Sequence, residues 1–334
     1  MPKSLLVATL GTSPAVVTEA IDLLAEQGVQ LDGVILFTTE DYDVQESLAL
    51  LSEHLPTHEG LNWVQSVRIA AHEDIRTSEA AVEFMEEACR ILKTYRDNGD
   101  RLFVCIAGGR KAMSSLLALA VQFYGAERLF HIWAPPWMEA EGEIGKLRGL
   151  PPEQLHERLH PPLNASDDDR PHMVDLPFLG LFPLLGDILG ALKGHSIPTR
   201  DVKQMLVAAG LLTTRGDATS LGQRVAEILD NVEGLPPARQ DECKVHIGKH
   251  HYQDRLKQFA EEVCARFPFV TKVQSMEWKQ GEEQVKPLRP NVLIVGTRLD
   301  TDILFRFELV TTATNPGQLE AARKAVERWI RRRG

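Results

Sequence analysis

The 334-residue sequence lacks any long hydrophobic run. No apolar stretch approaches the ~18–20 residues that a transmembrane helix needs, so we do not expect a membrane protein. The first residues, MPKSLLVATLG, carry one lysine and a short apolar run but no small-residue cleavage site, which favours a first strand over a secretion signal. With 43% hydrophobic and 25% charged residues, the composition indicates an ordinary globular protein.

Cysteine is also scarce. The four cysteines are Cys89, Cys105, Cys243 and Cys264, and no two of them form a CxxC pair. This spacing suggests neither a disulfide framework nor a zinc site. We therefore expect a protein of the reducing cytoplasm, with no metal and no cofactor.

Basic residues are few in the larger, first part of the chain. The net charge is −10, from 37 Lys+Arg against 47 Asp+Glu. Residues 1–239 carry 20 basic and 34 acidic residues (net −14), whereas residues 240–334 carry 17 and 13 (net +4), and the two sum to −10. The split favours a C-terminal part that meets a polyanion, although ordinary solvated surface would explain it equally well.

Short apolar runs alternate with amphipathic helical patterns over the first 150 residues. Buried-type strands are predicted at residues 4–10, 33–39, 63–69, 101–107 and 128–133. Helices are predicted between them, one after Gly11-Thr-Ser-Pro and others at residues 44–55, 77–98 and 111–124. Such alternation predicts an α/β fold, a Rossmann-like, mostly parallel doubly wound sheet that binds ligands outside the carboxyl ends of its strands.

The remainder of the chain predicts further parts. We assign residues 1–150 to the α/β domain and residues 151–177, which lie in a stretch rich in Pro, Gly and Asp, to a linker without regular structure. Residues 178–235 show short helices broken by a glycine turn and a TTRGDAT hairpin, as in a winged helix-turn-helix domain. Their few cations favour a packing or spacer role over DNA binding. Residues 240–334 predict a small α+β domain.

Two strand-to-helix turns, Gly11-Thr-Ser-Pro and Gly108-Gly-Arg-Lys, carry the clearest chemical signal. Glycine lets the backbone approach a ligand closely, and the N–H groups and dipole at a helix start attract an anion. Arg110 and Lys111 strengthen that attraction. If the first and fourth strands are sheet neighbours, both turns meet in one crevice, where the cations would face phosphate.

Other known glycine-rich motifs fit these turns less well. A dehydrogenase needs GxGxxG after the first strand, which GTSPAV does not match, although Glu40 resembles the acidic ribose ligand. A P-loop is absent from the sequence, and no His-Asp arrangement supports acyl transfer. A purely structural role, with a tight turn and solvated cations, is the remaining alternative.

The two turns lie in stretches that closely resemble the CRISPR-associated Rossmann-fold (CARF) sensors of type III CRISPR systems. These stretches are LLVATLGTSPAVVTE, starting at Leu5, and CIAGGRKAM, starting at Cys105. They are more narrowly similar to the NE-type subfamily, which also contains ring nucleases, and the likeness covers roughly residues 1–150. The resemblance implies a homodimer whose two-fold axis matches a cyclic oligoadenylate, most often cyclic tetra-adenylate.

The resemblance also implies a set of ligand-binding residues at the ends of the strands. They are Gly11, Thr12, Ser13, Thr39, Gly108, Gly109, Arg110 and Lys111. Ring-cleaving relatives use a hydroxyl and a lysine, which correspond here to Ser13 (or Thr12) and Lys111. Such a pair would let a ribose 2′-OH attack its own phosphodiester slowly, so ring nuclease activity is allowed by the sequence but not required.

Sensors of this kind usually carry a winged helix followed by an effector domain. Residues 240–334 lack both the Arg-x4-His signature of HEPN ribonucleases and the PD-ExK pattern of DNA nucleases. In size and layout they are similar to RelE-type mRNA interferases, which act in the ribosomal A site and cut mRNA without a metal, with basic side chains on the sheet rather than a pair of histidines. The resemblance implies an antiviral, ribosome-associated endoribonuclease activated by the cyclic oligoadenylate.

Strands of this domain are predicted at residues 271–279, 292–298 and 303–312, and three cations on them are candidates for catalysis: Lys279, Arg298 and Arg306. Arg298 and Arg306 flank a hairpin tip and are expected to face each other. RNA binding is expected from Lys286 and Arg289 in an intervening loop and from Arg331 and Arg332 at the end of the chain. Each could instead be an ordinary surface cation.

Two other functions stay open on this evidence. A ligand-controlled transcription regulator would bind DNA through its winged helix, and a stand-alone ring nuclease would only end signalling. We give DNA less weight as a partner than mRNA and the ribosome, and we expect no membrane partner.

Overall fold

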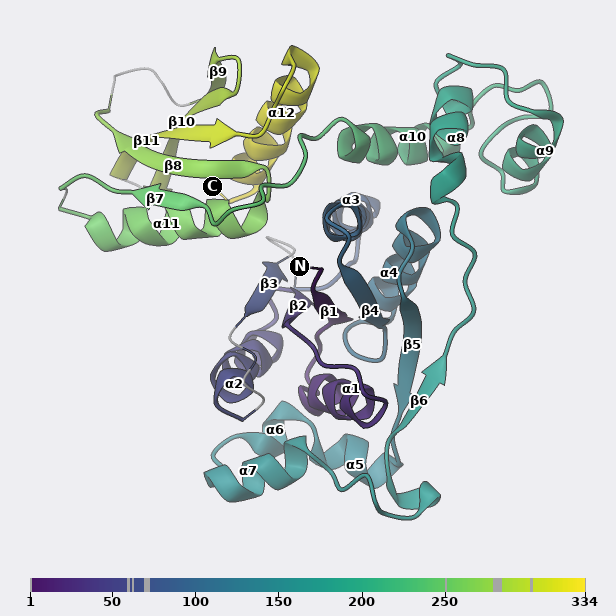
Figure 1. Cartoon of the computed structure of the whole chain (residues 1–334), viewed down its shortest axis with the longest axis vertical. Coiled ribbons are helices and arrows are strands. Elements are labelled where there is room, and N and C mark those ends of the chain that lie inside the picture. The colour runs from purple at the N-terminus through teal and green to yellow at the C-terminus, as the bar shows by residue number, and fades with distance from the viewer. Residues whose placement is uncertain are drawn as a thin grey trace. The chain divides into compact units, whose positions relative to one another are not determined.

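The structure of the chain, a computed structural model, describes residues 2–58, 61, 63–68, 73–249, 251–278, 284–300 and 303–333. The chain divides into two compact units, Met1–Ile228 and Leu229–Gly334, each with a β-sheet of its own (Figure 1). Among the described residues, no helix combines the length and the apolar character that a membrane crossing requires.

The first unit contains a six-stranded sheet in the order β3-β2-β1-β4-β5-β6. Strands β1 to β5 run parallel, and β6 pairs antiparallel with β5. The strands are β1 (Ser4–Thr9), β2 (Gly33–Thr38), β3 (Val64–Arg68), β4 (Arg101–Cys105), β5 (Arg128–Trp133) and β6 (His172–Asp175). The parallel α/β sheet predicted from the sequence is thus confirmed, and its strand order reverses between β1 and β4, the usual ligand position of such folds.

Four long helices cover the two faces of this sheet (Figure 1). They are α1 (Ala15–Glu26), α2 (Tyr42–His58), α3 (Ser78–Asp97) and α4 (Lys111–Tyr124). Successive strand residues point to opposite faces, so Leu6 and Ala8 of β1 join a core with α1 and α2. On the other face Phe37 of β2 packs against Phe84 of α3, with ring centroids 5.2 Å apart.

Residues 135–177 differ from the prediction, because most of them form regular structure. They include α5 (Pro136–Glu141), α6 (Ile144–Leu147), α7 (Pro152–Leu159) and the edge strand β6. The presumed linker, 151–177, therefore contributes a helix and a strand to the first unit. The prolines of residues 135–177 do not exclude helices, because α5 and α7 each begin on a proline, which the first helical turn accepts without losing a hydrogen bond.

Three further helices follow in residues 178–235. They are α8 (Leu185–Leu192), α9 (Arg200–Ala208) and α10 (Ser220–Glu233), and the boundary between the two units falls inside α10. A single antiparallel bridge joins Leu212 to Ala218 between α9 and α10. The helices and the hairpin agree with the sequence pattern, and the winged helix-turn-helix assignment stays a prediction.

The second unit contains a five-stranded sheet in the order β7-β8-β11-β10-β9, parallel between β7 and β8 and otherwise antiparallel. Its elements are β7 (Lys244–His246), α11 (Gln253–Arg266), β8 (Val270–Met276), β9 (Val285–Arg289), β10 (Val292–Asp300), β11 (Ile303–Thr311) and α12 (Pro316–Arg333). Both helices pack on one face: the ring of Phe259 in α11 lies 5.0 Å from that of Phe307 and 5.4 Å from that of Trp329 in α12.

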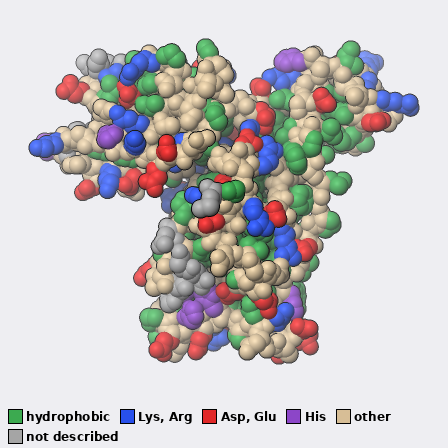
Figure 2. All heavy atoms as spheres, viewed as in Figure 1, with side chains coloured by type: hydrophobic (Ala, Val, Ile, Leu, Met, Phe, Trp, Pro, Cys, Tyr) green, Lys and Arg blue, Asp and Glu red, His purple; other side chains and the backbone are tan. Residues whose placement is uncertain are grey.

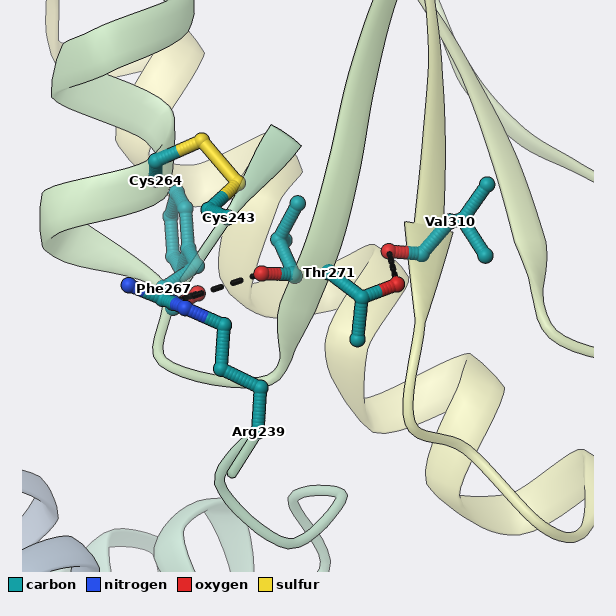
Figure 3. Close-up of a disulfide and its surroundings, with 7 residues drawn as sticks. Arg239, Cys243, Cys264, Phe267, Thr271 and Val310 are labelled. Carbon is teal, nitrogen blue, oxygen red and sulfur yellow. Dashed lines mark hydrogen bonds between the residues drawn. A yellow bond between two sulfur atoms is a disulfide. The ribbon is translucent and has the colours of Figure 1, made fainter. Parts of the chain in front are cut away.

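A disulfide in the second unit corrects our reading of the cysteines. Cys243 and Cys264 are bonded across 21 residues (Figure 3). The fold brings them together because α11 runs back antiparallel to β7, which places the end of the helix beside the start of the strand. Close to the disulfide, the Arg239 guanidinium donates hydrogen bonds of 3.3 Å to the carbonyls of Phe267 and Val270. The disulfide and these hydrogen bonds connect the same part of the second unit. Cys89 and Cys105 are buried thiols.

Candidate functional site

The two glycine turns predicted to converge do meet in the structure, because β1 and β4 are hydrogen-bonded neighbours. A Cβ added to Gly11 would lie 2.9 Å from the backbone nitrogen of Gly109, and one added to Gly108 would lie 2.4 Å from the carbonyl oxygen of Thr9. Gly109 also has a φ of +77°, which favours glycine. Glycine therefore allows the two backbone turns to touch. We call the site formed by these two turns the glycine crevice.

Two helices begin at the glycine crevice. The residues that precede α1 and α4, Pro14 and Arg110, make no side-chain cap hydrogen bond within the described part of the chain. The first-turn N–H groups of both helices, together with their dipoles, are thus suited to an anion. Lys111, the first residue of α4, is exposed, as is Thr12. The crevice has the elements of a phosphate site.

A neighbouring turn holds the first glycine turn in place. The Ser13 hydroxyl donates a hydrogen bond of 3.2 Å to the carbonyl of Gly142, and the Thr12 carbonyl accepts one of 2.7 Å from the N–H of Ile144. Ser13, our candidate hydroxyl for ring cleavage, therefore has a protein acceptor between α5 and α6.

Arg110 has acidic partners that the sequence did not suggest. Its guanidinium lies 3.1 Å from a carboxylate oxygen of Asp41 and 3.9 Å from one of Asp74. Asp41 also caps α2 through its other oxygen, which accepts the N–H of Asp43 at 3.0 Å. Thr39 is buried, and its hydroxyl accepts the Asp41 N–H at 3.4 Å. An anionic ligand would therefore compete with these carboxylates for Arg110.

A buried carboxyl group lies under the same end of the sheet, and our sequence analysis missed it. Glu19 of α1 is only 2% exposed, and its Oε2 has no hydrogen-bond partner among the described residues. Burial, followed by the charges of Glu139 and Asp22, raises the pKa of Glu19 from 4.5 to about 7. An acidic residue on the apolar face of a predicted helix was the available signal. Burial also raises the pKa of the nearby Cys105 thiol to about 12, so this thiol stays neutral.

A hollow of about 530 Å³ lies at the other, amino ends of β4 and β5. Its cations are matched by acids: Arg101 pairs with Glu127 at 3.2 Å, and Arg128 donates to Asp175 at 2.7 Å. This balance of charge does not favour a polyanion in that hollow.

In the second unit, cations gather on the sheet face that α11 and α12 leave uncovered. Directly opposed residues share a face: Arg306 opposes Gly296 and Met276, and Lys286 opposes Ile294. Registers and alternation place six cations and the acidic Glu308 on this surface, which we call the basic face; the cations are Lys244, Lys272, Lys286, Arg289, Arg298 and Arg306. Sequence reasoning missed Lys244 and Lys272.

The positions of the predicted effector residues differ in detail from expectation. Arg298 opposes Leu304 rather than Arg306, so the two arginines are diagonal neighbours on one face. Lys286 and Arg289 lie in β9 instead of a loop, and Arg289 pairs with Glu308 at 2.9 Å. Arg331 of α12 pairs with Glu327 at 2.7 Å. Lys279 and the side chain of Arg332 lie outside the described residues.

One group of side chains in the described ranges could hold a metal ion, although we expected none. It consists of His54, His156 and His160, which offer one ring nitrogen each, all within 4.8 Å of one another. The local sequence His156-Glu-Arg-Leu-His160 was an available signal.

Comparison with known proteins places the first unit in a family. The family model described as CRISPR-associated protein NE0113 matches residues 13–211, more than half of the chain. No curated protein has a sequence similar enough to match.

Two solved structures resemble the chain at low identity. Csm6 of Enterococcus italicus, bound to cyclic hexa-2′-fluoro-hexa-dAMP, is 15% identical with a TM-score of 0.39, and the match covers 70% of this chain and 54% of that one. Protein VC1899 of Vibrio cholerae is 12% identical with a TM-score of 0.32, over 92% of this chain and 77% of that one. The chain thus spans about half the length of the Csm6 chain that it matches.

Proposed function

Because the chain belongs to the family of CRISPR-associated protein NE0113, we propose that its first unit is a CARF sensor that binds a cyclic oligoadenylate. The observation that carries this proposal is the contact between the turns of Gly11 and Gly109, where the strand order reverses. There the starts of α1 and α4 lie together, with Lys111 exposed beside them. Backbone N–H groups and a lysine are suited to the phosphodiesters of such a ring.

The ligand's symmetry favours a homodimer in this proposal. A cyclic tetra-adenylate, our first candidate, has a two-fold axis and four phosphates, so each of two protomers would hold one half of it. An isologous dimer presents the same crevice twice. The ligand can shift the dimer from one arrangement to another only by the difference between its affinities for the two arrangements.

We further propose that the second unit is a ribonuclease of the RelE type that cuts mRNA on the ribosome as a type III CRISPR defence. The basic face supports this, because its exposed cations, such as Lys244 and Arg298, can hold an RNA backbone. Cleavage by a ribose 2′-OH on its own phosphodiester yields a cyclic phosphate and needs stabilised charge at the transition state. Arg298 and Arg306 would supply it.

A translating extract tests both parts of the proposal. Each cyclic oligoadenylate is first titrated into the intact protein by calorimetry, and saturable binding of at least one ring is expected. The same ring should then produce new mRNA ends in the extract. Salt-dependent DNA binding without RNA cleavage would favour the transcription regulator instead, and loss of the ring without RNA cleavage would favour the ring nuclease.

Lys111→Ala should weaken binding of the cyclic oligoadenylate by roughly 10- to 100-fold, because a charge-assisted hydrogen bond is worth about 1.5–3 kcal/mol. Any ring cleavage should slow as well. Calorimetry on both proteins measures the change. Lys257→Ala, which alters an exposed lysine of the second unit, is the matched control and should bind normally. Wild-type affinity and ring turnover in Lys111→Ala would remove this lysine from the site.

Asp41→Asn should instead strengthen binding, by about two- to fivefold. Asparagine keeps an oxygen to cap α2 but removes the charge that competes for Arg110, and an exposed pair of this kind is worth up to about 1 kcal/mol. Asp43→Asn is the control, since Asp43 pairs with Arg148 rather than Arg110. Unchanged affinity in Asp41→Asn would mean that Arg110 does not contact the ligand.

A further inference from the structure

Three histidine side chains of the first unit lie close together. His156 lies in α7, and His160 directly follows that helix with its N–H donating to the His156 carbonyl at 2.8 Å, so helical spacing continues through it. Residues four apart lie on the same side of a helix. His54 comes from α2, and Figure 2 shows histidine side chains gathered where α2 and α7 lie. The segment has the form His-Glu-x-x-His, which on a helix directs two imidazoles to one metal.

The ring nitrogens are close enough to share an ion. The Nε2 atoms of His54 and His160 are 2.9 Å apart, and one nitrogen of His156 lies within 4.8 Å of both. Around a tetrahedral zinc with bonds of about 2.0–2.1 Å, ligand nitrogens are about 3.4 Å apart. His156 is exposed, so its side chain has room to close the remaining distance.

A carboxylate sets the tautomer of one ring. The Nδ1 atom of His160 lies 2.9 Å from a carboxylate oxygen of Asp22 in α1. Since a carboxylate only accepts, Nδ1 carries the proton and Nε2 presents its lone pair toward His54. This is the outer-shell contact that metal-bound histidines commonly make.

The backbone that carries His156 and His160 is well anchored. Leu159, which lies between them in the sequence, is 0% exposed and packs with Ala15 and Leu147. Its carbonyl accepts a hydrogen bond from the Thr18 hydroxyl of α1. A site on such rigid elements holds its ligands in place without a large rearrangement.

We propose that His54, His156 and His160 bind one Zn²⁺ ion and that Asp22 orients His160 as a positioning residue. Three neutral imidazoles suit a borderline transition metal and lack the oxygens that Ca²⁺ and Mg²⁺ need. Three protein ligands leave a fourth position for water. The ion links α2 to α7, two helices from different parts of the sequence, and its binding does not depend on the proposed function.

The test uses untagged, full-length protein stripped with EDTA. Titration with ZnCl2 should show one ion per chain and a higher unfolding temperature, and CoCl2 should give the visible d–d absorption of a tetrahedral site. His156→Ala should weaken Zn²⁺ binding at least 100-fold, and Asp22→Asn about 10- to 100-fold. His195→Ala, at an exposed histidine before α9, is the control and should bind as the wild type does.

Two results would overturn the proposal. One is the lack of stoichiometric Zn²⁺ binding by the wild type, and the other is unchanged binding in both His156→Ala and His160→Ala. Far-UV circular dichroism checks that each variant folds, and His156→Gln replaces His156→Ala if the latter does not.

Discussion

Replacing Arg298 and Arg306 by alanine should abolish ligand-stimulated cleavage of mRNA while leaving cyclic oligoadenylate binding unchanged. The two guanidinium groups belong to diagonal neighbours on the basic face of β10 and β11. One preorganised donor to a transition-state charge is worth about 10²- to 10³-fold in rate, so losing both should reduce cleavage below detection. Ligand binding should persist because the glycine crevice lies in the other unit. Mapped mRNA ends in a translating extract measure the first effect, and calorimetry the second.

The controls separate chemistry from folding. Arg306 is only 8% exposed, so its truncation also affects packing, and Arg306→Lys keeps most of the volume and the charge. Arg298 is exposed, and Arg298→Ala alone should fold normally and still lose most of its activity. Lys257→Ala, on α11 and hence on the helical side of the sheet, should cut like the wild type. Undiminished cutting in the folded double variant would take both arginines out of the active site.

The first sheet was predictable because its signals are local. Strands β1, β2 and β4 are short apolar runs that each precede a long helix, and glycine turns mark the junctions at Gly11 and Gly108. The adjacency of β1 and β4 followed from the common strand order of such folds. The prediction for residues 135–177 was wrong because their Pro-, Gly- and Asp-rich composition is typical of irregular structure. Helix α7 and strand β6 form there because they pack against α1 and pair with β5.

The contacts around the site depended on residues far apart in the sequence. Arg110 meets Asp41 and Asp74 only because three loops share one end of the sheet.

In the second unit, strand β9 was not predicted because it contains Pro287, and proline disfavours a strand. This proline is tolerated because β9 is an edge strand. The disulfide of Cys243 likewise needed the return path of α11, which no spacing rule supplies.

Glu19→Gln should make the first unit more stable at alkaline pH, by about 3 kcal/mol. The folded-state pKa of Glu19 is raised from 4.5 to about 7, first by burial and then by Glu139 and Asp22. For an acid with a raised pKa, the contribution to stability is fully present below pH 4.5 and is lost as pH rises through 7. Each pKa unit corresponds to 1.36 kcal/mol, so ionising this group costs the wild type about 3 kcal/mol. Glutamine has no proton to lose, and the variant should lack this loss.

Urea unfolding of both proteins between pH 5 and pH 9 measures the effect on the first unit. The difference in free energy of unfolding between Glu19→Gln and the wild type should grow as pH rises from 5 to 7 and level off above pH 7. Any cost of fitting the amide is the same at each pH, so the slope is the informative quantity. Glu26→Gln, at an exposed position of the same helix, should show a small difference with little slope. A difference that stays constant for Glu19→Gln would mean that the carboxyl group is already ionised at neutral pH, and that a cation or water inside the fold compensates its charge.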